Sequence, residues 1–218
     1  MKADYVQRLR MTFSKDGPAR YISHLDLART LERALNRARL PVAYTHGFNP
    51  RPRLQIAAAL PLGYTSEHEL ADVLLTEKLE SEAARQQLMA KMAPGIDVYQ
   101  MEEVPISLPS LQASTAASSY VATPLDPVEF HVLQEKMEEI LAAETLPRER
   151  TRKGKVKVYD LRPLILDLAL TQTSDHLPHI YMHLMLQPGL TGRPDELLLT
   201  LGLDPLDCHI HRTKIELA

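Results

Sequence analysis

The chain has 218 residues, of which 44% are hydrophobic and 24% charged, as in an ordinary globular protein. This composition excludes a disordered or fibrous chain, and the length allows one large domain or two small ones. The single cysteine, Cys208, excludes a disulfide framework, a cysteine-based zinc site and an iron–sulfur cluster held by this chain alone. No apolar run approaches the roughly 18 residues that span a bilayer, and the N-terminus has no apolar signal core. We therefore expect a cytoplasmic protein without a membrane partner.

The net charge of −3 conceals a strong separation of charge along the chain. Residues 8–53 carry ten Lys or Arg against three acidic residues, and residues 148–157 carry six basic residues and one acid. The stretch between them, 54–147, holds four basic and fifteen acidic residues. This segregation predicts a basic, polyanion-binding face on an acidic body, although the charges of ordinary helix surfaces would give a similar count.

The first half of the chain alternates between strand and helix patterns. Residues 5–13 have the two-residue period of a half-buried strand, which predicts that Arg8 and Arg10 point outward. Ser23 is suited to cap a helix with Asp26 in its first turn, and Pro41 ends that helix. Further strands are expected at 42–44, 54–60, 69–77 and 96–104, with a second helix at 81–92.

The helix that follows Ser23 has two distinct faces. An apolar stripe includes Leu27, Leu31 and Leu35, and arginines recur every four residues on another face. These arginines are Arg29, Arg33 and Arg37.

The second half repeats the same order of elements after an uncharged segment at 105–118. We expect a strand at 119–123, a helix at 126–143, a flexible basic loop at 148–157, strands at 164–171 and 179–187, a short helix near 193–202 and a strand at 208–217. The sequence thus predicts an α+β protein of two tandem ferredoxin-like (βαββαβ) units with antiparallel sheets. Their expected bounds are 1–104 and 119–218, joined by the linker 105–118.

A ferredoxin-like sheet leaves one face open, and RNA-binding modules of this shape place single-stranded bases and phosphates there. Pro50 and Pro52 hold a Gly- and Pro-rich turn extended, so that Arg51 and Arg53 would project at a fixed spacing for phosphate. Asn49 and His46 could read base edges or fix the loop internally. The full set expected to bind RNA is Arg8, Arg10, Arg20, Tyr21, Arg51, Arg53, Arg148, Arg150, Arg152, Lys153, Lys155 and Lys157.

Three stretches carry a resemblance to a known family. GPARYISHLDLARTLERALNRARLPVAYTHGFNPRPRLQIAAALPLG (17–63), KGKVKVYDLRP (153–163) and GRPDELLLTLGL (192–203) resemble the radical-SAM-linked protein family. This is a bacterial family of unassigned activity whose domain occurs fused to, or encoded beside, radical SAM proteins. The resemblance implies a radical SAM partner that holds an iron–sulfur cluster, with or without cobalamin, and it implies an association with RNA more weakly. With one cysteine, this chain cannot itself hold such a cluster, and no cofactor is expected in it.

Histidines form the remaining candidate sites. His24, at the first turn of a helix, could act as a general base in metal-independent RNA cleavage, or it could simply hydrogen-bond within that turn. His179 and His183 on one expected strand, with His209 and His211 on another, suggest a metal site. The first strand of the unit is expected between them, so a role on an open face, contacting RNA, is favoured and no metal is expected.

These features favour an RNA-binding accessory module, for tRNA or rRNA, that presents RNA to a radical SAM enzyme and has no catalytic activity of its own. The alternatives are an RNA endonuclease that uses His24 and a protein-interaction scaffold whose basic face docks on an acidic partner.

Overall fold

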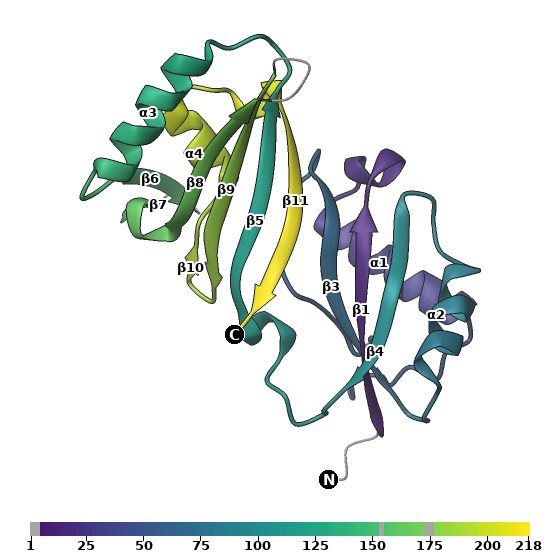
Figure 1. Cartoon of the computed structure of the whole chain (residues 1–218). Helices are drawn as coiled ribbons and strands as arrows, with labels where there is room; N and C mark the ends of the chain where they lie inside the picture. Colours follow the sequence, from purple (N-terminus) through teal and green to yellow (C-terminus); the bar gives the residue numbers. More distant parts are fainter. Residues whose placement is uncertain (1–4, 153–154, 173–176) are drawn as a thin grey trace. The chain divides into compact units, whose positions relative to one another are not determined.

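The computed structural model describes residues 5–152, 155–172 and 177–218 (Figure 1). The chain divides into two compact units, residues 1–115 and residues 116–218. The described part contains four α-helices, and every strand pair with an assigned register is antiparallel. The mixed α+β class expected from the sequence is therefore confirmed. No helix in this part of the chain is long and apolar enough to cross a membrane.

Unit 1 is an antiparallel sheet whose strands pair in the order β4-β1-β3-β2. Helices α1 and α2 connect its strands (Figure 1). The elements are β1 (Gln7–Lys15), α1 (His24–Arg37), β2 (Leu54–Ile56), β3 (Thr65–Leu75), α2 (Ser81–Met89) and β4 (Ile96–Val104), with short 3-10 helices at Gly17–Tyr21 and Leu111–Ser114.

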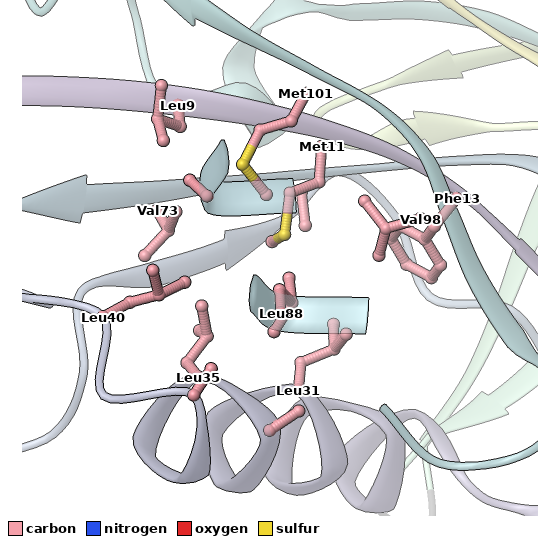
Figure 2. Close-up of a cluster of buried hydrophobic side chains, with 14 of the residues drawn as sticks. Leu9, Met11, Phe13, Leu31, Leu35, Leu40, Val73, Leu88, Val98 and Met101 are labelled. Atoms are coloured by element: carbon pink, nitrogen blue, oxygen red, sulfur yellow. The ribbon is translucent and has the colours of Figure 1, made fainter. Parts of the chain in front are cut away.

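The core of unit 1 follows from the two apolar periods in its sequence. Leu31 and Leu35 point from α1 toward sheet residues such as Met11 and Val73 (Figure 2), and all four are inaccessible to solvent. Burying each such side chain contributes roughly 1.5–3 kcal/mol. The helix begins as predicted, because the Ser23 hydroxyl accepts a hydrogen bond from the Asp26 amide at 3.2 Å.

The strands expected at 42–44 and 54–60 are shorter in the structure. Residues Val42 and Tyr44 form only isolated bridges, to Leu75 and Pro52, and β2 ends at Ile56. The proline-rich sequence explains this, because a proline has no amide hydrogen to donate to a strand ladder. The chain between Tyr44 and Pro52 is therefore a loop closed by one bridge.

The segment 105–114, expected to be a linker, is bound to unit 1. The Leu111 side chain is completely buried, and Gln112 donates its side-chain amide to the Ile56 carbonyl at 2.6 Å. The Leu111 amide donates to the Gln55 side chain at 3.2 Å. Residues 115–118 already belong to the following strand, β5 (Thr115–Pro124).

Unit 2 contains a second set of paired strands, in which β8, β9, β5 and β11 are neighbours in that order. Figure 1 shows the helices α3 and α4 together with the separate pair β6 and β7. The elements are α3 (Phe130–Ala142), β6 (Pro147–Arg152), β7 (Lys155–Asp160), β8 (Ile165–Gln172), β9 (Pro178–Gln187), β10 (Leu190–Thr191), α4 (Pro194–Leu201) and β11 (Cys208–Leu217), with 3-10 helices at Arg162–Leu164 and Pro205–Asp207.

The flexible basic loop expected at 148–157 is instead a β-hairpin. Strands β6 and β7 pair antiparallel, with Arg148 opposite Tyr159 and Glu149 opposite Val158. Lys153 lies outside the described residues. Of Arg150, Arg152, Lys155 and Lys157, only the backbone is described.

Candidate nucleic-acid interface

Arg8 and Arg10 do not project from β1 into solvent, as the sequence had predicted. Arg8 is 5% exposed, and its Nε donates to Asp72 Oδ2 at 2.7 Å. Arg10 is 11% exposed and donates its Nε to Asp72 Oδ1 at 2.9 Å. Arg8 also donates to the carbonyls of Leu108 and Pro109 at 2.8 and 2.9 Å.

Asp72 lies on β3 directly opposite Arg10 on β1, so the strand register itself brings the charges together. The carboxylate is 2% exposed and bridges both guanidiniums. Buried ion pairs of this kind are costly to break, because the remaining charge stays desolvated. Arg8 and Arg10 therefore hold the sheet and the 105–114 segment together and are not available as a pair of phosphate contacts.

Arg20 and Tyr21 lie at the end of the first 3-10 helix, just before α1. The guanidinium of Arg20 lies 5.2 Å from the centre of the Tyr21 ring, and its Nε donates to the Gly63 carbonyl at 3.2 Å. Tyr21 is 69% exposed. Leu25 and Leu62 are also exposed. The Gly63 amide donates to the Arg20 carbonyl at 2.9 Å, which brings residues 62–63 close to Arg20. Arg20 and Tyr21 thus form a cation–π pair with the aromatic ring open to solvent.

The loop that carries Arg51 and Arg53 separates these two side chains. Arg51 is exposed, and its amide donates to the Thr45 hydroxyl at 3.0 Å. Arg53 is half-buried: its Nε donates to the Tyr44 carbonyl at 3.3 Å, and its guanidinium lies 5.3 Å from the Tyr5 ring centre. The prediction that both arginines project is therefore wrong for Arg53, whose side chain folds back on the body of unit 1.

The tip of this loop presents an aromatic ring to solvent. Phe48 is fully exposed, and the preceding Gly47 has a φ of 123°, a conformation that side chains disfavour. The Tyr44 hydroxyl donates to Asn36 Oδ1 of α1 at 2.7 Å, which joins the base of the loop to the helix. The base of the loop, with the partly exposed ring of Tyr44, is thereby held against α1.

The sequence argument had noted the arginine stripe of α1 but had not counted it among the RNA-binding residues. Arg29, Arg33 and Arg37 are exposed, as is Arg39 just after the helix. Arg29 has only a loose exposed contact, 3.4 Å from Asp26 Oδ1, and Arg37 donates to the Lys91 carbonyl at 2.9 Å. Together with the exposed residues of the loop, these arginines form a set that we call the α1 surface. Its members are Arg29, Arg33, Arg37, Arg39, Tyr44, Phe48 and Arg51.

The α1 surface is strongly positive. Residues 17–63 contain seven arginines and only two acidic residues, Asp26 and Glu32. Within the described residues, no carboxylate pairs with the side chains of Arg33 or Arg51. The signal that could have found this surface was the spacing of four residues between arginines, which places them on one side of a helix.

In unit 2, Arg148 has a structural role. Its Nη2 donates to the Glu196 carbonyl at 3.1 Å and contacts the Thr200 hydroxyl, so it ties β6 to α4. Among the basic residues of this hairpin, only the Arg148 side chain is described.

The candidate histidines lie on separate elements. His24 is the first residue of α1 and is half-buried, and its catalytic role stays a prediction. β5 lies between β9, which carries His179 and His183, and β11, which carries His209 and His211. His183 Nε2 lies 3.5 Å from Glu216 Oε2. Among the described residues, no group of three or more His, Cys, Asp or Glu side chains is arranged to hold a metal ion.

The model of a bacterial protein family, described as "Uncharacterized protein conserved in bacteria (DUF2344)", matches residues 8–194. The chain belongs to the DUF2344 family. The DUF2344 match includes the whole α1 surface and the β6–β7 hairpin. A comparison with curated protein sequences gave no match.

Solved structures show a distant likeness to this DUF2344 protein. A chain in the "Crystal Structure of a Cbf5-Nop10-Gar1 Complex" matches with a TM-score of 0.51 and 10% identity, over 95% of this chain and 48% of that one. A chain in the "Crystal structure of the archaeal box H/ACA sRNP Nop10-Cbf5 complex" gives a TM-score of 0.46 and 11% identity, over 96% and 48%. The protein spans about half the length of these chains. At such low identity, the first likeness shows the fold alone.

Proposed function

We propose that this protein is an RNA-binding accessory module that contacts RNA through the α1 surface. The observation that carries the proposal is the exposed row of arginines on α1, together with the exposed ring of Phe48 on the loop that Tyr44 joins to this helix. Arginine is the side chain best suited to bidentate contact with phosphate, and exposed aromatic rings accept unpaired bases by stacking. A surface with both features suits RNA segments with unpaired nucleotides, as in the loops of tRNA or rRNA.

The electrostatics favour a polyanion over a small anion. Arg29, Arg33 and Arg37 lie one helical turn apart, so their successive Cα atoms are separated by about 6 Å along the helix axis. That distance is close to the spacing of neighbouring phosphates in a nucleic-acid strand. Because these side chains are exposed, binding a phosphate releases water and counterions and replaces only the exposed contacts of Arg29 with Asp26 and of Arg37 with the Lys91 carbonyl.

We also propose that each unit is a ferredoxin-like module, with the β6–β7 hairpin inserted after α3 in unit 2. The element order β-α-β-β-α-β and the strand order β4-β1-β3-β2 support this for unit 1. In unit 2 the order β8-β9-β5-β11 supports it, because β5 and β11 are there the first and last strands of the module. This proposal concerns the architecture and does not itself imply RNA binding.

A radical SAM enzyme is the proposed protein partner. This proposal rests on the family resemblance of the stretches 17–63, 153–163 and 192–203. Because the chain has a single cysteine, any iron–sulfur cluster would be held by that partner. We propose a cytoplasmic location on the same sequence grounds. Retention of a radical SAM protein on the tagged native chain, and its loss with an untagged competitor, would support the partnership; retention of unrelated proteins only would contradict it.

RNA retention across a salt series tests the proposed function. The native protein is mixed with bacterial tRNA and rRNA fractions, and affinity is measured as salt is raised. The variants Arg33→Glu and Arg51→Glu each reverse one exposed charge of the α1 surface, and Lys78→Glu, at a side chain 71% exposed outside that surface, is the matched control. We expect affinity to fall steeply with salt, and each α1-surface variant to reduce the slope of log affinity against log salt by about 0.7 or more.

Three results would overturn the proposal. The first is that no RNA fraction is retained at low salt. The second is that Lys78→Glu weakens binding as much as the other two variants do. The third is that polyglutamate binds as tightly as RNA, because that result would assign the surface to an acidic protein partner.

A further inference from the structure

A cavity of about 440 Å³ lies in unit 2, beside the base of the β6–β7 hairpin. Its walls come from β7, from the 3-10 helix after it, and from the turn and strand β10 that precede α4. Two of the three stretches that carry the sequence resemblance, 153–163 and 192–203, therefore meet at this cavity. The cavity is separate from the α1 surface, which belongs to unit 1.

The cavity is shaped by a close approach of two backbone segments. A Cβ atom on Gly192 would lie 2.8 Å from the Leu164 carbonyl oxygen, so only glycine fits there. Asp160 shapes the other wall, because its Oδ1 accepts hydrogen bonds from the amides of Leu146 at 2.7 Å and Arg162 at 3.0 Å. The opening is thus built from turns held by specific contacts.

The lining combines a flat apolar wall with a few polar groups. Tyr159, Leu164 and Leu190 supply an aromatic ring and two aliphatic surfaces. Asp160 supplies a carboxylate, and Arg193 supplies a guanidinium whose Nε donates to Asp195 Oδ1 at 3.0 Å. The volume falls within the range of small-molecule sites, roughly 300–1,000 Å³, in which apolar walls bury the ligand and a few polar groups orient it.

The ligand chemistry that fits this lining is a nucleobase. A base has two flat apolar faces, for the Tyr159 ring and the leucine walls, and an edge with both donors and acceptors, for a carboxylate and a guanidinium. A long aliphatic ligand would leave the polar groups of the lining unsatisfied. The hairpin that supplies Tyr159 and Asp160 has a sequence rich in Lys and Arg, residue types that attract phosphates.

We propose that this cavity binds one unpaired nucleobase of the RNA. The inference rests on the proposed function and adds to it a second, base-reading site in unit 2. The α1 surface would supply affinity through phosphates, whereas the cavity would distinguish an unpaired nucleotide from a paired one.

Binding of single nucleotides tests the cavity directly. The isotope-labelled native protein is titrated with each of the four ribonucleoside monophosphates, and the backbone amides of Gly189 and Gly192 report occupation. The chain has only eight glycines, and their amides are readily resolved in nitrogen–proton spectra. We expect at least one monophosphate to shift both signals at millimolar concentration. Shifts confined to other residues, or none at all, would overturn the cavity proposal.

A matched pair of variants connects the cavity to RNA. Leu190→Asp changes a side chain at the cavity that is 52% exposed, so the fold should tolerate it. Leu206→Asp makes the same change at a side chain that is 86% exposed and does not line the cavity. Because the variant places a carboxylate against an apolar face of the base, we expect Leu190→Asp to weaken both nucleotide and RNA binding by about tenfold. Leu206→Asp should leave both within about twofold.

The outcomes separate the two proposals. If RNA binds through the α1 surface but Leu190→Asp behaves like Leu206→Asp, the cavity proposal fails and the proposed function stands. If monophosphates bind at Gly189 and Gly192 but no RNA is retained, the proposed function fails, and the result supports the nucleobase chemistry of the cavity alone.

Discussion

Removing the carboxylate of Asp72 is expected to destabilise unit 1 strongly. In Asp72→Ala, the Arg8 guanidinium, only 5% exposed, would lose its counter-charge while remaining buried. Arg10, at 11% exposure, would lose its partner at the same time. Removing one member of a buried ion pair costs about 3–5 kcal/mol, because an uncompensated charge stays out of water.

The magnitude translates into a large thermal shift. For a unit of 115 residues, each kcal/mol corresponds to about 4 °C in Tm, so the expected loss is roughly 12–20 °C. Circular dichroism during heating, with urea unfolding as a second measure, gives the difference. Lys78→Ala is the control: its pair with Glu103 spans 3.7 Å with the lysine 71% exposed, and exposed pairs of this kind contribute below about 1 kcal/mol.

A triple variant distinguishes a structural role of these arginines from an RNA-binding role. Arg8→Met, Arg10→Met and Asp72→Leu together remove all three charges and replace them with apolar groups, which is often neutral or stabilising in a buried site. We expect this protein to recover most of the lost stability and to bind RNA as the native chain does. A stable triple variant with RNA affinity reduced tenfold or more, or a cost below about 1 kcal/mol for Asp72→Ala, would refute the assignment of Arg8 and Arg10 to the interior.

Two further predictions concern a thiol and a turn. Burial raises the pKa of Cys208 to about 11. At pH 8 the native thiol should therefore react with a disulfide reagent about a hundredfold more slowly than the thiol of the unfolded chain, and its rate should rise as the pH approaches 11. Equal rates for the native and unfolded chains would contradict this prediction. Gly95→Ala should lower the Tm of unit 1 well beyond Gly63→Ala. Both glycines have φ near 85°, but a Cβ on Gly95 would lie 2.3 Å from the Asp16 carbonyl oxygen. A Cβ on Gly63 would have no described atom within 4 Å other than those of its own residue and its two chain neighbours. Similar melting temperatures for the two variants would show that the turn relaxes.

Local patterns predicted most of the elements correctly. The period-two strand of 5–13 gives the buried row Leu9, Met11 and Phe13, and the helix after Ser23 buries Leu31 as its apolar spacing requires. These features succeed because strand and helix periods depend on neighbours within a few residues. The apolar face of an element can therefore be found without knowledge of the fold.

What covers the other face of an element is a long-range property, and there the sequence argument failed. Alternation correctly placed Arg8 opposite to Leu9, but Asp72 is 64 residues away and the Leu108 carbonyl is 100 residues away. Only the register of β1 with β3 and the path of the 105–114 segment make Arg8 buried. Local sequence contains no sign of either.

The hairpin at 147–160 was missed for a different reason. Six basic residues among the ten of 148–157 suggested a solvated, flexible loop. The alternation of Val156 and Val158 with Lys155 and Lys157 was the available strand signal. The number of charged residues had more influence on the predicted loop than the two-residue period of the valines did.

These corrections change the mode of RNA binding that we propose for unit 1. The face of its sheet that carries Arg8 and Arg10 is joined to the 105–114 segment, so bases have no free access to it there. The exposed cations and rings lie instead on α1 and on the loop that has Phe48 at its tip. A helix face that offers phosphate contacts at one-turn spacing binds any backbone of suitable shape, and discrimination among RNAs must then come from stacking at loop rings and from pockets that admit an unpaired base.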